Sequence, residues 1–137
     1  MQLMPSRIRR VQALRAWDLK KAGEILAMLR RENPGLSAWD ALEGVISYLS
    51  GDYEKSIEYY QKALKSYQQL KYPSDIAEAI NGLAATYRYW EKYDLAILYY
   101  QQYAKAIEFS PFNVDGRFYA AYGLGMSQAE KGDCISA

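Results

Sequence analysis

The chain of 137 residues has no histidine, a single cysteine and only four prolines. Without histidine it has no imidazole base, no His-containing catalytic triad and no histidine ligand for a metal. The one thiol, Cys134, can form neither an internal disulfide nor a Cys-rich zinc site. We therefore expect neither a metal nor a cofactor in this chain.

Long hydrophobic runs are also absent. No apolar stretch approaches the ~18 residues that a membrane span requires. The first five residues, MQLMP, lack the order of a basic and then an apolar region that marks a signal peptide. A single thiol fits a reducing compartment. We expect a chain without a membrane span, located in the cytoplasm.

The net charge is only +1, but its distribution along the chain is uneven. Residues 1–31 hold eight basic and two acidic side chains, whereas residues 32–137 hold nine basic and fourteen acidic ones. Four arginines at the start offer a basic contact: Arg7, Arg9, Arg10 and Arg15. Such a segment can bind nucleic acid or a membrane surface, or it can be a solvated helix face that docks on an acidic neighbour.

What the chain does contain is helical periodicity and many aromatic residues, including fourteen tyrosines. Apolar residues recur at i, i+4, i+7 and i+11 from Tyr53 to Leu64 and again from Tyr93 to Ala104. This spacing places them on one face of a helix. Gly51 and Asp52 indicate a turn followed by a side chain that caps the next helix. Asp75 and Glu78 have the spacing of a capping box.

The same pattern occurs three times. Gly44, Ala84 and Gly125 recur at spacings of 40 and 41 residues, and Ser56 is followed by Ala96 at a spacing of 40. Small residues at these positions allow helix backbones to approach closely. A repeat of this length predicts a stack of helix pairs that bury their apolar faces together.

The pattern resembles the tetratricopeptide repeat (TPR) in an extended form of about 40 residues. The residues that carry the resemblance are Gly44, Gly51, Tyr53, Tyr60, Ala63, Leu83, Ala84, Tyr87, Tyr93, Ala96, Tyr100, Leu124, Gly125 and Gly132. The first unit departs from the family, because Arg10 stands where a small residue is expected and Trp17 where glycine is. The resemblance implies an all-α, right-handed solenoid of antiparallel helix pairs.

We expect about seven helices and a truncated eighth, near 6–15, 19–32, 38–49, 53–70, 76–89, 93–109, 116–130 and from Asp133. They form one domain over residues 1–137, with a degenerate or capping repeat at 1–36, repeats at 37–75 and 76–115, and a truncated repeat at 116–137. An array of this kind is usually closed by a polar capping helix, so we expect the chain to be part of a longer protein.

No catalytic constellation stands out. Glu54 and Glu58 lie one helical turn apart, but lysines surround them on a polar face, which is typical of solvated charge pairs. Gly123, Leu124 and Gly125 lack the lysine and the spacing of a phosphate-binding loop, and they fit helix packing better. We expect no enzyme activity and no small-molecule substrate.

In a TPR stack the first helix of each pair lines a concave groove. The candidate partner-binding residues on these helices are Tyr48, Glu78, Asn81, Arg88, Tyr89, Tyr122 and Met126. The Asn81 amide can both donate to and accept from a peptide backbone, as the matching asparagine does in extended TPR proteins, or it is an exposed polar residue. Arg88 with Tyr89 and Tyr122 makes a cation–aromatic floor or packs between helices.

The resemblance implies a protein–protein or peptide interaction module, with a protein or peptide as its partner. An alternative is a sensory or regulatory module of a longer bacterial signalling or transcription-regulating protein. A third hypothesis is a nucleic-acid contact through the basic N-terminal helices. The truncated C-terminal repeat also offers a surface for a homodimer.

Overall fold

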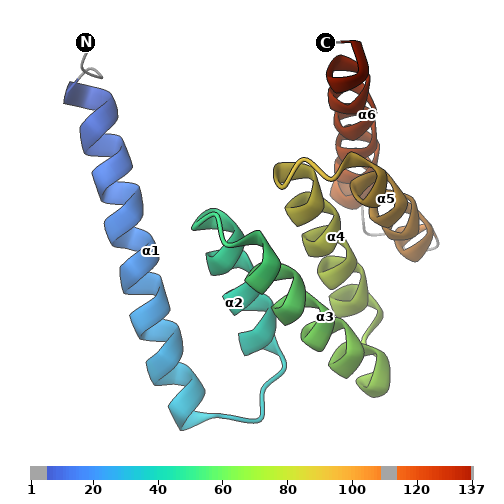
Figure 1. The fold of residues 1–137 in the computed structure, drawn as a ribbon. Coiled ribbons are helices and arrows are strands. Elements are labelled where there is room, and N and C mark those ends of the chain that lie inside the picture. Colours follow the sequence, from blue (N-terminus) through green and yellow to red (C-terminus); the bar gives the residue numbers. More distant parts are fainter. Residues whose placement is uncertain (1–5, 109–113, 137) are drawn as a thin grey trace.

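The computed structural model describes residues 6–108 and 114–136, and describes side chains within 16–108 and 115–132. These residues form six α-helices and no strand, which confirms the all-α fold class (Figure 1). The helices are α1 (Ser6–Glu32), α2 (Ala38–Leu49), α3 (Tyr53–Leu70), α4 (Pro73–Tyr89), α5 (Tyr93–Ile107) and α6 (Val114–Ser136).

The turn between α2 and α3 forms as the sequence predicts. Gly51 adopts a positive φ of 86°, which glycine reaches without a steric penalty. The Asp52 side chain then accepts a hydrogen bond of 3.3 Å from the backbone N–H of Lys55 and caps α3. The predicted bounds of α2 and α3 are confirmed.

The start of α4 differs from the prediction. This helix begins at Pro73, and Tyr72 precedes it as the N-cap without a side-chain hydrogen bond. Proline suits the first turn because its missing N–H would have no partner there anyway. The predicted capping box of Asp75 and Glu78 is therefore wrong, since both residues already lie inside the helix.

The helix count is also corrected, from seven and a truncated eighth to six within the described residues. The predicted helices at 6–15 and 19–32 are one continuous helix, because the segment around Trp17 contains neither glycine nor proline to end it. No turn forms at Gly132, and α6 continues to Ser136. The turn at Gly51, by contrast, is held by α3 packing back on α2.

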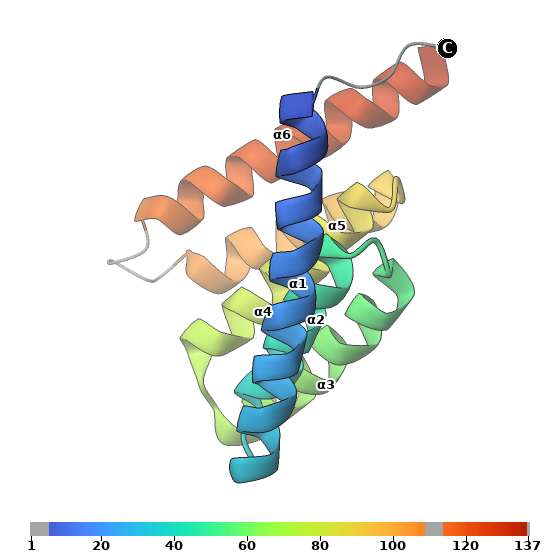
Figure 2. The ribbon, with the colours of Figure 1, turned by 90° about the vertical axis from the view of Figure 1, so that its left-hand side faces the viewer.

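The helices form a two-layered solenoid of antiparallel pairs, as predicted. Figures 1 and 2 show α3 and α5 on one side, and α2, α4 and α6 following one another along the other. Each of α2, α4 and α6 also contacts the next of these three directly. Within the described part of the chain α1 packs mainly against α2, and its N-terminal half lies apart from the other helices in Figure 1.

Two tyrosine rings lock the layers together. The Tyr60 ring lies against Gly44 of its own pair and Gly82 of the next, where a Cβ atom would collide with it. Tyr100 packs in the same way against Gly123, and it shares a buried cluster with Ala84 and Ala96. Burying such large side chains is the main source of stability, at about 1.5–3 kcal/mol for each apolar one.

The predicted role of small residues is thus confirmed for Gly44, Ala84 and Ala96 but not for Gly125. Gly125 is exposed, and nothing lies within 4 Å of a Cβ atom built on it. The prediction missed Gly82 and Gly123, which approach the tyrosine rings most closely. At the centre, the Ser56 hydroxyl donates to the Gly44 carbonyl at 2.8 Å, so its buried oxygen has a partner.

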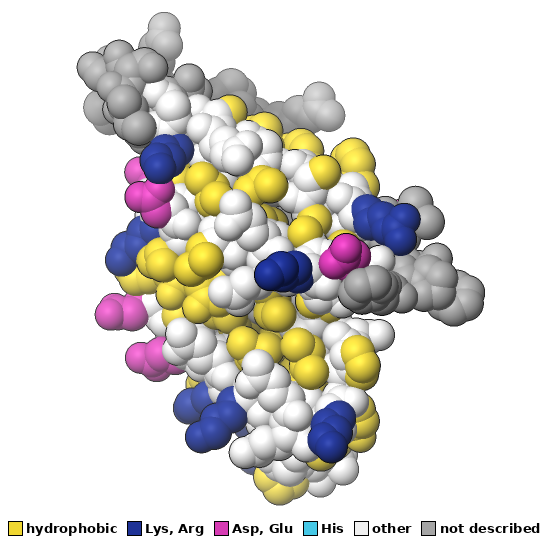
Figure 3. All heavy atoms as spheres, turned by 90° about the vertical axis from the view of Figure 1, so that its right-hand side faces the viewer, with side chains coloured by type: hydrophobic (Ala, Val, Ile, Leu, Met, Phe, Trp, Pro, Cys, Tyr) yellow, Lys and Arg dark blue, Asp and Glu magenta, His cyan; other side chains and the backbone are white. Residues whose placement is uncertain are grey.

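The face on the right of Figure 1, where α5 lies, carries apolar side chains across its middle and charged side chains around them (Figure 3). Leu95 and Leu98 of α5 are among the exposed large apolar residues.

In the described residues no helix combines the length and the apolar character needed to cross a bilayer.

Candidate partner-binding surface

The C-terminal halves of α2 and α4 and the N-terminal half of α6 bring a set of aromatic side chains together. Tyr48 of α2 stacks on Tyr89 of α4, with ring centroids 5.9 Å apart and planes 11° from parallel. On α6, Tyr122 stacks on Phe118 at 5.9 Å. The Arg88 guanidinium lies between the two stacks, 5.5 Å from the Tyr89 ring and 5.9 Å from the Tyr122 ring. We call these five residues the aromatic row.

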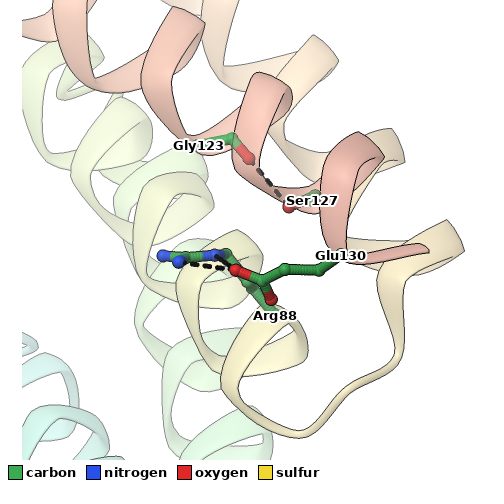
Figure 4. Close-up of polar contacts among 4 residues, drawn as sticks. All are labelled: Arg88, Gly123, Ser127 and Glu130. Carbon is green, nitrogen blue, oxygen red and sulfur yellow. Dashed lines mark hydrogen bonds and ion pairs between the residues drawn. The ribbon is translucent and has the colours of Figure 1, made fainter. Parts of the chain in front are cut away.

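Arg88 is fixed by an ion pair with Glu130 of α6. Its Nε and Nη2 atoms both donate to Oε1 of Glu130, at 3.1 and 2.8 Å (Figure 4). Burial by itself lowers the pKa of Arg88, but the hydrogen bond and charge of Glu130 outweigh it and raise that pKa above its ordinary value. The pair therefore joins α4 to α6 and neutralises the cation in the row.

The rings of the row remain open to solvent. Tyr89 is 54 %, Tyr122 51 % and Phe118 62 % exposed. Exposed rings of this size, gathered across several elements, are typical of binding surfaces, because aromatic side chains supply a large contact area at low entropic cost.

A hollow of about 490 Å³ adjoins the row at the end of α2. Its walls come from the aromatic side chains of Tyr48, Tyr53 and Tyr89, together with Leu49, Ser50 and Gly51. None of these lining residues carries a charge. The hollow is thus an uncharged recess at one end of the row.

The structure therefore brings together four of the predicted residues: Tyr48, Arg88, Tyr89 and Tyr122. The other three lie elsewhere on the same helices. Asn81 of α4 is partly buried and two turns before Arg88, which is about 10 Å along the helix. Glu78 is exposed about one turn farther away, and Met126 is partly buried one turn after Tyr122.

The basic residues of the N-terminal segment are only partly described. Arg7, Arg9, Arg10 and Arg15 fall in α1 where the structure describes no side chains. Farther along, Arg30 donates to Asp40 of α2 at 3.0 Å, and Lys21 lies 3.9 Å from Glu24. The described part of this segment thus already uses two of its cations within the fold.

Sequence reasoning missed Phe118, Tyr53 and the pairing of Glu130 with Arg88. Phe118 could have been found, because it lies four residues before Tyr122 and hence on the same helix face. No sequence signal points to the ion pair, since Arg88 and Glu130 belong to different helices 42 residues apart.

Comparison with known proteins identifies the family to which the repeats belong. No curated protein matches the chain. A family model described as the tetratricopeptide repeat matches residues 40–108, which cover α2 to α5 except for the first two residues of α2. The matched segment is half of the chain and contains both complete helix pairs. The chain therefore belongs to the tetratricopeptide repeat family.

Proposed function

We propose that this chain is a non-catalytic module that binds an extended segment of a partner protein along α2, α4 and α6. Membership of the family indicates a protein–protein interaction module. The observation that carries the proposal is the aromatic row, which crosses three first helices and keeps three of its four rings at least half exposed.

The row has the character of an interaction hot spot. Tyrosine and arginine are enriched among the residues that dominate binding energy, and they act best where neighbouring contacts exclude water. Arg88 is already held by Glu130, so it needs little further ordering when a partner covers it. Asn81 extends the surface along α4 and can hold the partner's backbone.

The other hypotheses differ in the surface that they use or in the protein that contains it. A nucleic-acid contact would use the basic start of α1 and would weaken steeply as salt is added. A homodimer would use the truncated C-terminal repeat at 116–137 and would show in the mass in solution. The regulatory alternative places the same groove in a longer bacterial signalling or transcription-regulating protein, so a test of the groove bears on both proposals.

The test is affinity capture of partner proteins from lysate of the source cells. The wild-type chain is compared with a Tyr89→Ala/Tyr122→Ala variant, and far-UV circular dichroism checks that both are equally helical. We expect a protein that the wild type captures and the variant loses. Truncating Arg88 is less informative, because it would leave Glu130 unpaired between α4 and α6.

Tyr72→Ala is the matched control, because Tyr72 is 50 % exposed, makes no capping hydrogen bond and lies at the opposite end of α4. Capture by this control must equal that of the wild type. If the double variant captures the same proteins as the wild type, the binding surface is elsewhere and the proposal is wrong.

A further inference from the structure

We propose that the segment bound by the aromatic row is an uncharged, proline-rich stretch in the polyproline II conformation. This inference rests on the proposed function and narrows it to one class of ligand. Four observations support it: the charge of the row, its hydrogen-bonding groups, the spacing of its helices and the hollow beside it.

The charge of the row argues against an acidic or basic ligand. Arg88 is the single cation among the five residues of the row, and both of its hydrogen bonds described above go to Glu130. A carboxylate from a ligand would have to compete with this pair in a partly buried setting. The row thus offers aromatic surface with no net charge, and an uncharged segment complements it best.

The hydrogen-bonding groups of the row can serve the carbonyl oxygens of such a segment. Tyr89 and Tyr122 each bring a phenolic hydroxyl, which can donate to a carbonyl oxygen. A polyproline II segment has no internal hydrogen bonds, so its carbonyls are open to such donors, and its prolines have no N–H to satisfy.

The spacing of the helices matches the repeat of this conformation. Packed helices lie about 8–10 Å apart, so the row from α2 through α4 to α6 extends over about 16–20 Å. A polyproline II helix rises about 3.1 Å per residue with three residues per turn, so it presents the same face about every 9 Å. About six residues would therefore cross the row, with one proline ring over each helix.

The hollow beside the row provides an end pocket. It is walled by Tyr48, Tyr53 and Tyr89 and has no charged lining residue. Proline rings pack against aromatic side chains, and aromatic-lined grooves are the usual receptors for segments already ordered as polyproline II. A pre-ordered ligand also loses less conformational entropy on binding. This matters here because a surface of five residues provides few contacts to offset that loss.

The test titrates the full chain with an acetylated and amidated peptide of eight prolines, followed by NMR of the tyrosine rings. We expect saturable shifts at Tyr48, Tyr89 and Tyr122. We expect the affinity to fall by about tenfold or more in Tyr89→Ala/Tyr122→Ala and to stay unchanged in Tyr72→Ala. Tyr89→Phe keeps the ring but loses the hydroxyl, so its affinity should fall by a smaller factor.

A peptide of the same length with alternating glycine and serine, and one of glutamate and glycine, serve as comparison probes. Equal or tighter binding of either probe at the row overturns the inference, as does proline-peptide binding that the double variant retains. If the proline peptide fails to bind while the captured partner still depends on Tyr89 and Tyr122, the proline-rich inference is wrong and the proposed function stands. If neither the binding of the proline peptide nor the capture of the partner depends on these rings, the proline-rich inference and the proposed function are both wrong.

Discussion

At the scale of single residues, two tyrosine rings occupy space that glycines leave on neighbouring helices. Tyr60 lies between Gly44 and Gly82, and Tyr100 lies against Gly123. Both rings are buried, so they have little freedom to move aside. The close approach of the helices therefore depends on the absence of a Cβ atom at these positions.

We predict that Gly82→Ala and Gly123→Ala each lower the free energy of unfolding by about 1–3 kcal/mol, because the added methyl group collides with a buried ring. Urea denaturation followed by circular dichroism measures the change. Gly125→Ala is the matched control, since its Cβ enters open space, and it should stabilise the helix by about 0.5–1 kcal/mol. Three equal effects would contradict this account of the packing.

A second residue-scale prediction concerns the turn between α4 and α5. Glu91 has a positive φ of 61°, where the corresponding residue of the previous turn is Gly51. A left-handed conformation costs a residue with a Cβ about 1–2 kcal/mol. Glu91→Gly should therefore raise the free energy of unfolding by about 1 kcal/mol, measured as a higher Tm. Glu58→Gly, at an exposed position inside α3, should lower it by about as much, and a lower Tm for Glu91→Gly would refute the argument.

At the scale of elements, α1 is the helix with the weakest attachment. Leu26 is buried, and the ion pair between Arg30 and Asp40 ties the end of α1 to α2. The Arg30 guanidinium also lies 5.8 Å from the Tyr59 ring of α3. A few contacts at one end thus hold a helix of 27 residues.

We predict that Asp40→Ala loosens α1 selectively, because it leaves Arg30 partly buried without its carboxylate partner. Hydrogen exchange should become faster in residues 16–32 and stay unchanged in α5. Glu24→Ala is the control, since its pair with Lys21 is exposed and 3.9 Å long and contributes little. Uniformly faster exchange in all helices would show that α1 is not a separate unit.

The element scale also shows where prediction from sequence succeeds. The bounds of α2 and α3 were predicted because the signals lie within the segment: an apolar stripe, a glycine with positive φ and a capping aspartate. Two of the predicted turns do not form. The segment around Trp17 has neither glycine nor proline to end a helix, so α1 runs unbroken from Ser6 to Glu32. At Gly132 a glycine alone does not end α6, because a turn in a repeat also needs a helix that packs back on it.

In the candidate site, too, some features follow from the sequence and others depend on how neighbouring helices pack. Tyr48 and Tyr89 are predicted to share the groove because each lies on the first helix of its pair, and these helices line the groove in the family. The hollow beside Tyr53 and the ion pair of Arg88 with Glu130 depend on how neighbouring helices are rotated and offset. Periodicity within one helix does not specify these quantities, so the structure was needed to find them.

At the scale of the whole molecule, the core contains tyrosines from several helices. Burial raises the pKa of Tyr60, Tyr67, Tyr87, Tyr100 and Tyr103 above the ordinary value of 10.0. The folded state therefore holds these protons more tightly than the unfolded state. Stability from this source is complete below about pH 10 and is lost as the pH rises above that value.

We predict that the free energy of unfolding is lower at about pH 11 than at about pH 9, measured by urea denaturation at matched ionic strength. Tyr60→Phe should make this loss smaller, because it removes the group with the largest raised pKa among the described tyrosines. Tyr72→Phe, at an exposed position, should leave the loss unchanged. A stability that does not change across this range would contradict the burial of ionisable tyrosines in the core.

The central claim is that the aromatic row is the surface that meets a protein partner. The most direct measurement places a photo-crosslinking phenylalanine at position 89 and, separately, at position 72, and then irradiates each chain with the captured partner. Our account predicts a crosslinked product from position 89, mapped to a proline-rich stretch of the partner, and none from position 72. A product from position 72 alone would contradict it.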